Sequence, residues 1–253
     1  MRLAVAASLT LSALVIASAA HAVGVPGQGS WETTLLGRDI HGQAVAASSA
    51  SAVFLYDTQL DITWLRNASV NGRADWAASN TWAKTLVVGD YAGWRLPTMV
   101  DSGLVGCDTG WAHTYSFDGE DCGYNVDTRS SEMAHLFYVT LGNRAAYDTS
   151  GQAQPSAGLT NTGDFEGLQG FQSSAYWSGL QGQDTHRVAW YFGMFDGFQG
   201  DADKAFTNYA MAVHSGDVAL VPEPSTAALI LAGLIALGAR RGRQLFTKAS
   251  ARQ

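Results

Sequence analysis

Acidic side chains are concentrated around the two cysteines of the chain, Cys107 and Cys122, where they could bind calcium. A calcium ion takes about six to eight oxygen ligands, which carboxylates supply well. The spacing is not that of an EF-hand, so a solvated acidic loop is the alternative interpretation. The candidate ligands are Asp108, Asp118, Glu120, Asp121 and Asp127.

Aromatic side chains in the same segment could contact sugars. Trp111, Tyr115 and Tyr124 lie among glycines and acidic residues, in a sequence typical of a loop. Aromatic rings in loops are suited to stacking on sugar rings, because their faces are accessible. The aromatic residues of the expected strands (Trp177, Trp190, Tyr191 and Phe195) are more typical of a core, since alternation turns half of a strand inward.

Arg95, in the sequence Trp94-Arg-Leu-Pro-Thr98, has two possible roles. Its guanidinium could bind a carboxylate or sulfate through two parallel hydrogen bonds. It could equally pair with an acidic side chain of the protein itself. The acidic composition favours this structural pairing over a ligand-binding role.

Catalytic motifs are absent from the sequence. It has no His-Glu-x-x-His, Gly-x-Ser-x-Gly, Walker or Cys-x-x-Cys pattern. His135 lies among apolar residues, which is typical of a core or boundary histidine rather than a base. We therefore expect no catalytic residues and no required cofactor, with calcium as the one ion to consider.

Composition and charge limit the possible partners. The chain has 253 residues, of which 47% are hydrophobic and 15% charged, and this indicates a folded protein with a sizeable core. Residues 23–220 hold nine Lys and Arg against 21 Asp and Glu, a net charge of −12. An acidic surface repels phosphate backbones, so nucleic acid is excluded as a general partner, whereas cations are attracted.

Residues 1–22 are typical of a signal peptide. Arg2 precedes an apolar run, and Ala20-His-Ala22 is a small-x-small cleavage pattern. The sequence then changes abruptly to glycine-rich polar residues. We expect export, with signal peptidase as a transient partner.

The C-terminal end carries a second address. Val221–Thr226 contains two prolines and is followed by an apolar run of about 13 residues, which is short for a membrane span of roughly 20. Arg240, Arg241 and Arg243 follow, and a basic flank stays on the cytoplasmic side. This order is typical of a processed anchor, with residues 244–253 as a basic cytoplasmic tail. A core helix is the poorer interpretation, because the run has no polar face.

Residues 221–243 resemble the PEP-CTERM sorting signal of Gram-negative bacteria that produce exopolysaccharide. The match comprises Pro222, Glu223 and Pro224 in register with the apolar run and the arginines. The resemblance implies recognition by an exosortase and cleavage near this triplet. It also implies a transient anchor in the inner membrane and delivery to the cell surface or extracellular matrix.

Export bears on the two cysteines. Outside the cytoplasm Cys107 and Cys122 are expected to form a disulfide, with free thiols as the alternative. Closing a loop of about 15 residues would contribute roughly 3 kcal/mol in the chain-entropy model.

Periodicity predicts an α+β fold. Residues 51–65 are expected to form two strands around the turn at 57–61, and Asp75 is expected to cap a helix. A second helix should begin near Ser130 or Ser131 and run to Leu141. The last third is expected to be a β-meander with strands at 174–178, 187–195 and 209–213, the second ending at Asp196-Gly197. Residues 23–50 are expected to be an N-terminal strand or linker and 51–220 the main domain.

Residues 52–218 resemble secreted bacterial domains related to the C-terminal domain of the collagen-like protein Lcl. The matching segments are Tyr56-Asp-Thr58, Asp61–Asn67, Gly93–Thr98, His135–Asn143, Tyr176-Trp-Ser178, Ala189–Phe192, Asp196-Gly197 and Tyr209–Asp217. The resemblance implies a C-type-lectin-like fold with two helices and a mostly antiparallel sheet. The Glu-Pro-Asn and Trp-Asn-Asp triplets of calcium-dependent sugar binding are missing, and His214 stands where an Arg-Pro-Gly pattern would be expected.

Together these observations predict a non-catalytic, exported surface or matrix protein that acts in adhesion by contacting polysaccharide. Two alternatives remain open. One is an enzyme akin to formylglycine-generating enzymes, which share the broader fold and need a reactive cysteine pair. The other is a structural matrix protein without a ligand.

Overall fold

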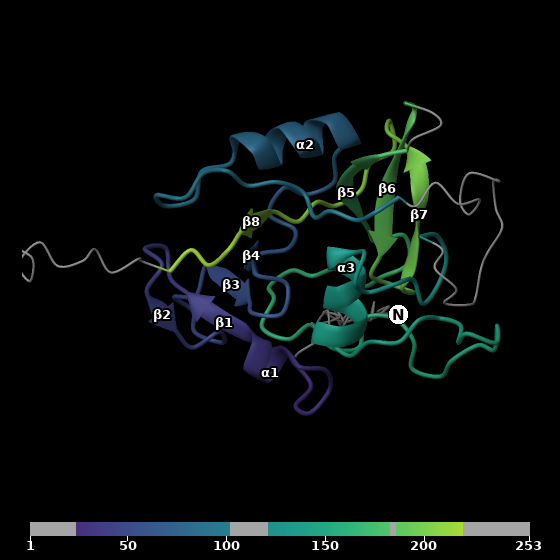
Figure 1. Ribbon diagram of the computed structural model, residues 1–253, viewed down its shortest axis with the longest axis horizontal. Helices are drawn as coiled ribbons and strands as arrows, with labels where there is room; N and C mark the ends of the chain where they lie inside the picture. The colour runs from purple at the N-terminus through teal and green to yellow at the C-terminus, as the bar shows by residue number, and fades with distance from the viewer. Residues whose placement is uncertain (1–23, 102–120, 183–185, 220–253) are drawn as a thin grey trace, which may run out of the picture.

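The protein is α+β, with few helices and two antiparallel sheets (Figure 1). The computed structural model describes residues 24–101, 121–182 and 186–219. The α+β expectation is therefore confirmed. Within the described ranges, no helix has the length and apolar character needed to cross a bilayer. The predicted signal peptide, sorting signal and basic tail all lie outside the described residues.

The larger sheet has five strands in the order β2-β1-β3-β4-β8. Its centre is the predicted hairpin: Phe54 of β3 pairs with Leu65 of β4, and the Asp57 carboxylate accepts the backbone N–H of Gln59 in the turn. β1 pairs with β3, so part of the predicted N-terminal strand or linker region belongs to this sheet. The short helix α1 (Trp31–Thr34) precedes β1. The strands are β1 (Leu35–Arg38), β2 (Ala44–Val45), β3 (Phe54–Asp57), β4 (Ile62–Leu65) and β8 (Val213–Ser215).

The smaller sheet consists of β5 (Ala175–Gln181), β6 (Val188–Gly193) and β7 (Phe198–Asp203), in that order. The turn between β6 and β7 is the predicted Asp196-Gly197. Gly197 has φ 78°, a conformation that glycine adopts without strain, and Asp196 Oδ1 accepts the N–H of Phe198. The predicted hairpin is confirmed.

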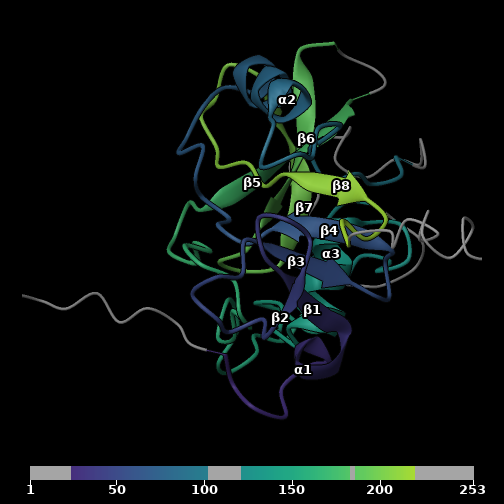
Figure 2. The same ribbon diagram turned by 90° about the vertical axis from the view of Figure 1, so that its left-hand side faces the viewer.

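Residues 209–215 connect the two sheets (Figures 1 and 2). Tyr209 forms a parallel bridge with Tyr176 of β5, and Val213 pairs with Trp64 of β4. The sequence predicted one strand over 209–213. Instead the chain leaves the smaller sheet after Tyr209 and joins the larger sheet at Val213. A segment that crosses between two sheets cannot pair continuously with either.

Helix α2 (Trp76–Thr85) begins as predicted at Asp75, whose side chain accepts the N–H of Ala78. Its Ala83 packs with Trp177 of the smaller sheet. The Trp177 indole N–H also donates to the carbonyl of Ala74 (3.0 Å), which fixes the start of the helix to β5.

The second predicted helix begins at α3 (Glu132–His135), with Ser131 as N-cap, and continues as a π-helical segment η2 (Leu136–Thr140). The sequence predicted the helix but not its wider last turn. The N–H of Leu141 reaches the carbonyl of Leu136, five residues back, and this bond defines the π-helical geometry.

The main core lies where this helix packs between the two sheets. The larger sheet contributes Leu55 and Trp64, the helix Phe137, and the smaller sheet Tyr176 and Phe192. All five side chains are fully buried. Part of the opposite face of β5–β7 packs against α2, where Trp177 and Ala189 are fully buried.

Candidate functional site

The predicted calcium ligands lie only partly within the described residues. Asp108, Asp118 and Glu120 are outside them. Asp121 is buried, and its backbone carbonyl accepts Gln199 Nε2 (2.6 Å). In the parts of the chain that are described, no three His, Cys, Asp or Glu side chains are grouped so that they could hold a metal.

Asp127 is engaged by a neighbouring arginine. Its carboxylate accepts the backbone N–H (2.8 Å), Nε (3.0 Å) and Nη2 (2.7 Å) of Arg129. These hydrogen bonds, first those from the side chain, lower the pKa of Asp127. The calcium site stays a prediction, because three of its five candidate ligands lie outside the described residues.

Arg95 has the structural role that the sequence favoured. Its Nη1 and Nη2 donate to the two carboxylate oxygens of Glu132 (2.8 and 2.7 Å). The same carboxylate accepts the N–H of Thr98 (2.7 Å). This pairing fixes the Trp94–Thr98 segment to the start of α3.

The loop aromatics that were expected to stack on sugars differ in position. Trp111 and Tyr115 lie outside the described residues. Tyr124 is only 8% exposed, and its ring contacts Tyr147 and Phe198, with ring centroids 5.2 Å apart in both cases. Tyr124 lines a cavity beside β5–β7, described below, and its ring is not an open surface on which a sugar could stack.

Cys122 is disulfide-bonded, buried, and borders the same cavity. Cys107, the only other cysteine of the chain, lies outside the described residues.

This cavity, here called the β5–β7 cavity, has a volume of about 720 Å³. The strand register explains how it forms. Ala175, Tyr191, Phe198 and Ala202 all line it, and the pairing of the three strands puts them on the face opposite Tyr176 and Phe192 of the core.

Two glycines lie on this face of the sheet among the aromatic side chains. Gly200 lies directly opposite Tyr191, and Gly193 lies between Ala175 and Phe198 in the register. Neither glycine projects a side chain, and the space beside Gly193 is occupied by Asp196 and the Phe195 ring. A Cβ atom added at Gly193 would lie 2.7 Å from Asp196 Oδ1, which shows how closely the hairpin end closes the cavity.

Aromatic rings and polar groups share the walls. Tyr191 and Phe198 have ring centroids 6.4 Å apart, and Phe206 at the rim is 63% exposed. The other lining residues are Arg73, Cys122, Tyr124, Ser173, Val188, Phe195, Asp196, Asp201, Asp203, Thr207 and Asn208.

The cavity carries negative charge close to an apolar surface. Burial, followed by the nearby carboxylates of Asp196 and Asp201, raises the pKa of Tyr191 to about 12. Asp203 pairs with the exposed Arg187 (2.7 Å), and Arg73 donates from Nε and Nη2 to the carbonyl of Thr207. The lining therefore combines carboxylates with aromatic side chains.

No family model, curated protein or solved structure matches this chain. Its function is therefore argued from the site itself.

Sequence reasoning missed most of this site. It assigned the strand aromatics to the core, which is correct for the buried Trp177 and Trp190. Tyr191 packs against the core cluster around Trp177 and also lines the cavity, as Phe195 does. The signal that could have identified the cavity is the recurrence of Gly and Ala at positions that face Tyr191 across the hairpin.

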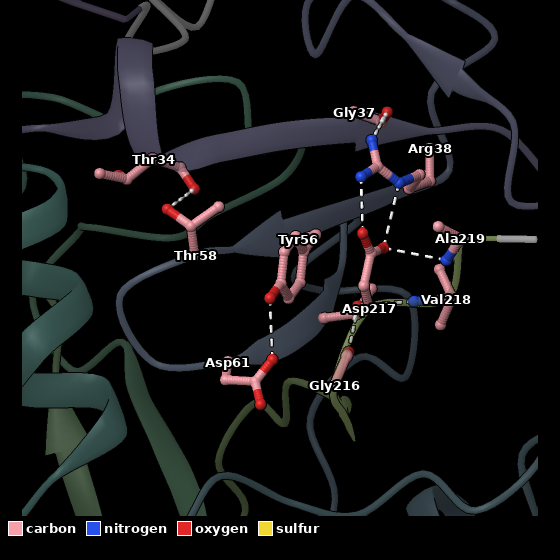
Figure 3. A network of polar contacts seen from close by, with 11 residues as sticks. Thr34, Gly37, Arg38, Tyr56, Thr58, Asp61, Gly216, Asp217, Val218 and Ala219 are labelled. Carbon is pink, nitrogen blue, oxygen red and sulfur yellow. Dashed lines mark hydrogen bonds and ion pairs between the residues drawn. The ribbon is translucent and has the colours of Figure 1, made fainter. Parts of the chain in front are cut away.

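A second polar cluster lies on the larger sheet near the end of the described chain (Figure 3). Arg38 Nε and Nη2 donate to the two carboxylate oxygens of Asp217 (3.0 and 2.6 Å). Asp217 Oδ1 also accepts the N–H of Ala219 (2.9 Å), and Tyr56 donates to Asp61 (2.8 Å). These contacts join the first strand of the sheet to the residues that follow its last.

Proposed function

We propose that the protein is exported and acts at the cell surface or in the extracellular matrix as a non-catalytic protein that binds polysaccharide. The observation that carries the binding proposal is the β5–β7 cavity. Sugars have apolar ring faces that pack on aromatic side chains and hydroxyls that donate to carboxylate and amide oxygens. Tyr191 and Phe206 supply the rings, and Asp201 and Asn208 the acceptors.

The proposed fold is C-type-lectin-like. Two antiparallel sheets with few helices are compatible with it, and some of the segments that carry the Lcl resemblance lie where the sheets meet. Arg95 of the Trp94–Thr98 segment bridges to Val213, and Tyr176 bridges to Tyr209. Since a fold alone does not determine a function, the proposal depends on the cavity.

Substitution at the cavity rim tests the binding. The full chain should be retained on at least one extracellular polysaccharide, and Phe206→Ala should weaken its affinity about twofold to tenfold, since an aromatic contact is worth about 0.5–1.5 kcal/mol. Phe171→Ala is the matched control, because Phe171 is also an exposed phenylalanine (51%) but does not line the cavity. Failure of the wild-type chain to bind any polysaccharide on a glycan array would contradict the proposal.

Sorting has a separate test. Replacing Pro222, Glu223 and Pro224 by alanines should leave the protein in the inner membrane, because the exosortase would no longer recognise it. Fractionation of producing cells measures this, and Ser225→Ala with Thr226→Ala is the control. Release of the triple variant at the wild-type level would show that the triplet is not the recognition element.

One observation favours an enzyme as the second candidate: Cys122 borders the cavity. An oxidase akin to formylglycine-generating enzymes would need this cysteine pair for turnover. In our proposal the pair is structural, so Cys107→Ser with Cys122→Ser should lower the unfolding free energy by about 3 kcal/mol and leave polysaccharide binding intact. Loss of an oxidase activity in the double variant would reverse this assignment. A protein whose melting temperature ignores both sugars and Ca²⁺ would instead fit the ligand-free structural alternative.

A further inference from the structure

A second cavity, here called the β1–β2 cavity, lies beside α1, β1 and β2 (Figure 1). Its volume is about 680 Å³, and it is lined by residues 31–32, 35–38 and 44–48 and by Asp164. None of these residues lines the β5–β7 cavity. The β1–β2 cavity is therefore a separate candidate site on the larger sheet.

Apolar side chains form one part of its lining. A Cβ atom added at Gly37 of β1 would lie 2.7 Å from Cα of Ala47, so residues 45–47 pass close over the strand. Leu36 of β1 is 39% exposed. Trp31 of α1 also lines the cavity, and its only polar side-chain atom, Nε1, is buried. The part of the Trp31 side chain that a ligand can reach is therefore hydrocarbon.

Asp164 brings a carboxylate to this apolar surface. Gly163, which precedes it, packs on Trp31, because a Cβ atom added there would lie 3.4 Å from Cγ and Cδ2 of the indole. The carboxylate of Asp164 forms no hydrogen bond or ion pair with any residue that the structure describes. Burial raises the pKa of Asp164, and the positive charge of Arg66 opposes this more weakly. A donor supplied by a ligand would therefore stabilise the ionised carboxylate.

The two arginines close to the cavity already have acidic partners. Arg38 donates to both carboxylate oxygens of Asp217 (Figure 3), at 3.0 and 2.6 Å. Arg66 pairs with Glu166 (3.3 Å), and its Nε donates to the backbone carbonyl of Asp164 (2.9 Å) rather than to the carboxylate. Each positive charge therefore has a carboxylate of its own, and that of Asp164 is left over.

Glu32 adds a second acidic group to the lining. It accepts the backbone N–H of Gly27 (2.8 Å) but forms no ion pair within the described ranges. Two carboxylates are too few for calcium, which takes about six to eight oxygen ligands. The described residues also group no three His, Cys, Asp or Glu side chains that could hold a metal. An ammonium group needs less, because a single carboxylate can accept a charge-assisted hydrogen bond from it.

We propose that the β1–β2 cavity binds organic ligands that carry a protonated amine on an apolar body. The ammonium group donates to Asp164, and the apolar body packs on Trp31 and Leu36. A neutral ligand of the same shape keeps the apolar contacts but loses the charge-assisted hydrogen bond. An anionic ligand brings its own carboxylate towards Asp164 and Glu32, and like charges at close range are repelled.

Three ligands with the same apolar chain separate these classes: hexylamine, hexanol and hexanoate. Calorimetric titration of the full chain at about pH 8 keeps hexylamine protonated, since alkylamines have pKa values near that of lysine, about 10.4. It also keeps Asp164 ionised despite its raised pKa. We expect hexylamine to bind at least about tenfold more tightly than hexanol, the gain of one charge-assisted hydrogen bond. Hexanoate should bind most weakly.

Asp164→Asn tests the site directly, because it removes the charge and keeps the shape. It should weaken the binding of hexylamine about tenfold and leave that of hexanol unchanged. The matched control is Asp90→Asn, which removes one charge at an exposed position outside the cavity. Equal weakening by both variants would mean that the acidic surface as a whole attracts the amine, and the inference would be overturned.

Leu36→Ala tests the apolar wall and replaces Asp164→Asn if that variant melts earlier than the wild type. It should weaken hexylamine and hexanol alike by about fourfold, the effect of one buried methylene group. Phe206→Ala, in the β5–β7 cavity, should change neither affinity. Wild-type affinity in Leu36→Ala would place the ligand elsewhere and overturn the inference. Equal affinities of hexylamine and hexanol, or no binding of hexylamine at all, would also refute it.

Discussion

Replacing Asp217 by alanine is expected to lower the free energy of unfolding by about 3 kcal/mol, because breaking a buried ion pair leaves the other charge uncompensated. The side chain of Arg38 is only 11% exposed and that of Asp217 25%. Arg38 would keep its bond to the carbonyl of Gly37 but lose both bonds to the carboxylate. Chemical denaturation of the purified chain measures the loss.

Two further variants separate burial from simple pairing. Arg129→Ala removes an ion pair of nearly the same length (2.7 Å against 2.6 Å) whose arginine is 84% exposed, and it should cost less than about 1 kcal/mol. Combining Asp217→Ala with Arg38→Met removes the stranded charge and should recover part of the stability. Equal effects of Asp217→Ala and Arg129→Ala would contradict the argument.

Gly142→Ala is the second variant with a large expected effect. Gly142 has φ 63°, and a Cβ atom there would lie 2.4 Å from the backbone nitrogen of Gly29. The clash is with main chain, which cannot rotate away, so the N-terminal segment must move off the end of η2. We expect a loss of about 3 kcal/mol or more, the sum of left-handed strain of about 1–2 kcal/mol and an overpacking cost of about 1–3 kcal/mol.

Gly72→Ala is the matched control for backbone strain alone. Gly72 has nearly the same φ, 65°, but nothing within 4 Å of the added Cβ atom. It should cost about 1–2 kcal/mol. The difference between the two melting curves measures the close approach of Gly29 and Gly142. If the curves coincide, contact between these two segments contributes nothing.

Local signals in the sequence were enough for several elements. Asp75 caps α2, Asp196-Gly197 turns the hairpin of β6 and β7, and the turn at 57–61 separates β3 from β4. Each of these depends on residues within a few positions of one another, so the chemistry that fixes them is visible in the linear sequence.

The candidate site could not be predicted in the same way, because it depends on register. Tyr191 shares a face with Phe198 and Ala202 only because of the register between β6 and β7. A shift of one residue would turn the ring to the other face of the sheet. The partner of Arg95 was likewise unpredictable, since Glu132 is 37 residues away and is brought near only by the completed fold.

The link between the two sheets has a consequence for how the chain matures. Residues 209–213, which run from β5 of the smaller sheet to β4 of the larger sheet, are among the last parts of the domain to leave the ribosome. Asp217, which pairs with Arg38, follows them. Helices and hairpins can form during synthesis, but contacts over such separations must wait for the whole domain. A nascent chain stalled before residue 209 should therefore stay sensitive to protease along its entire length.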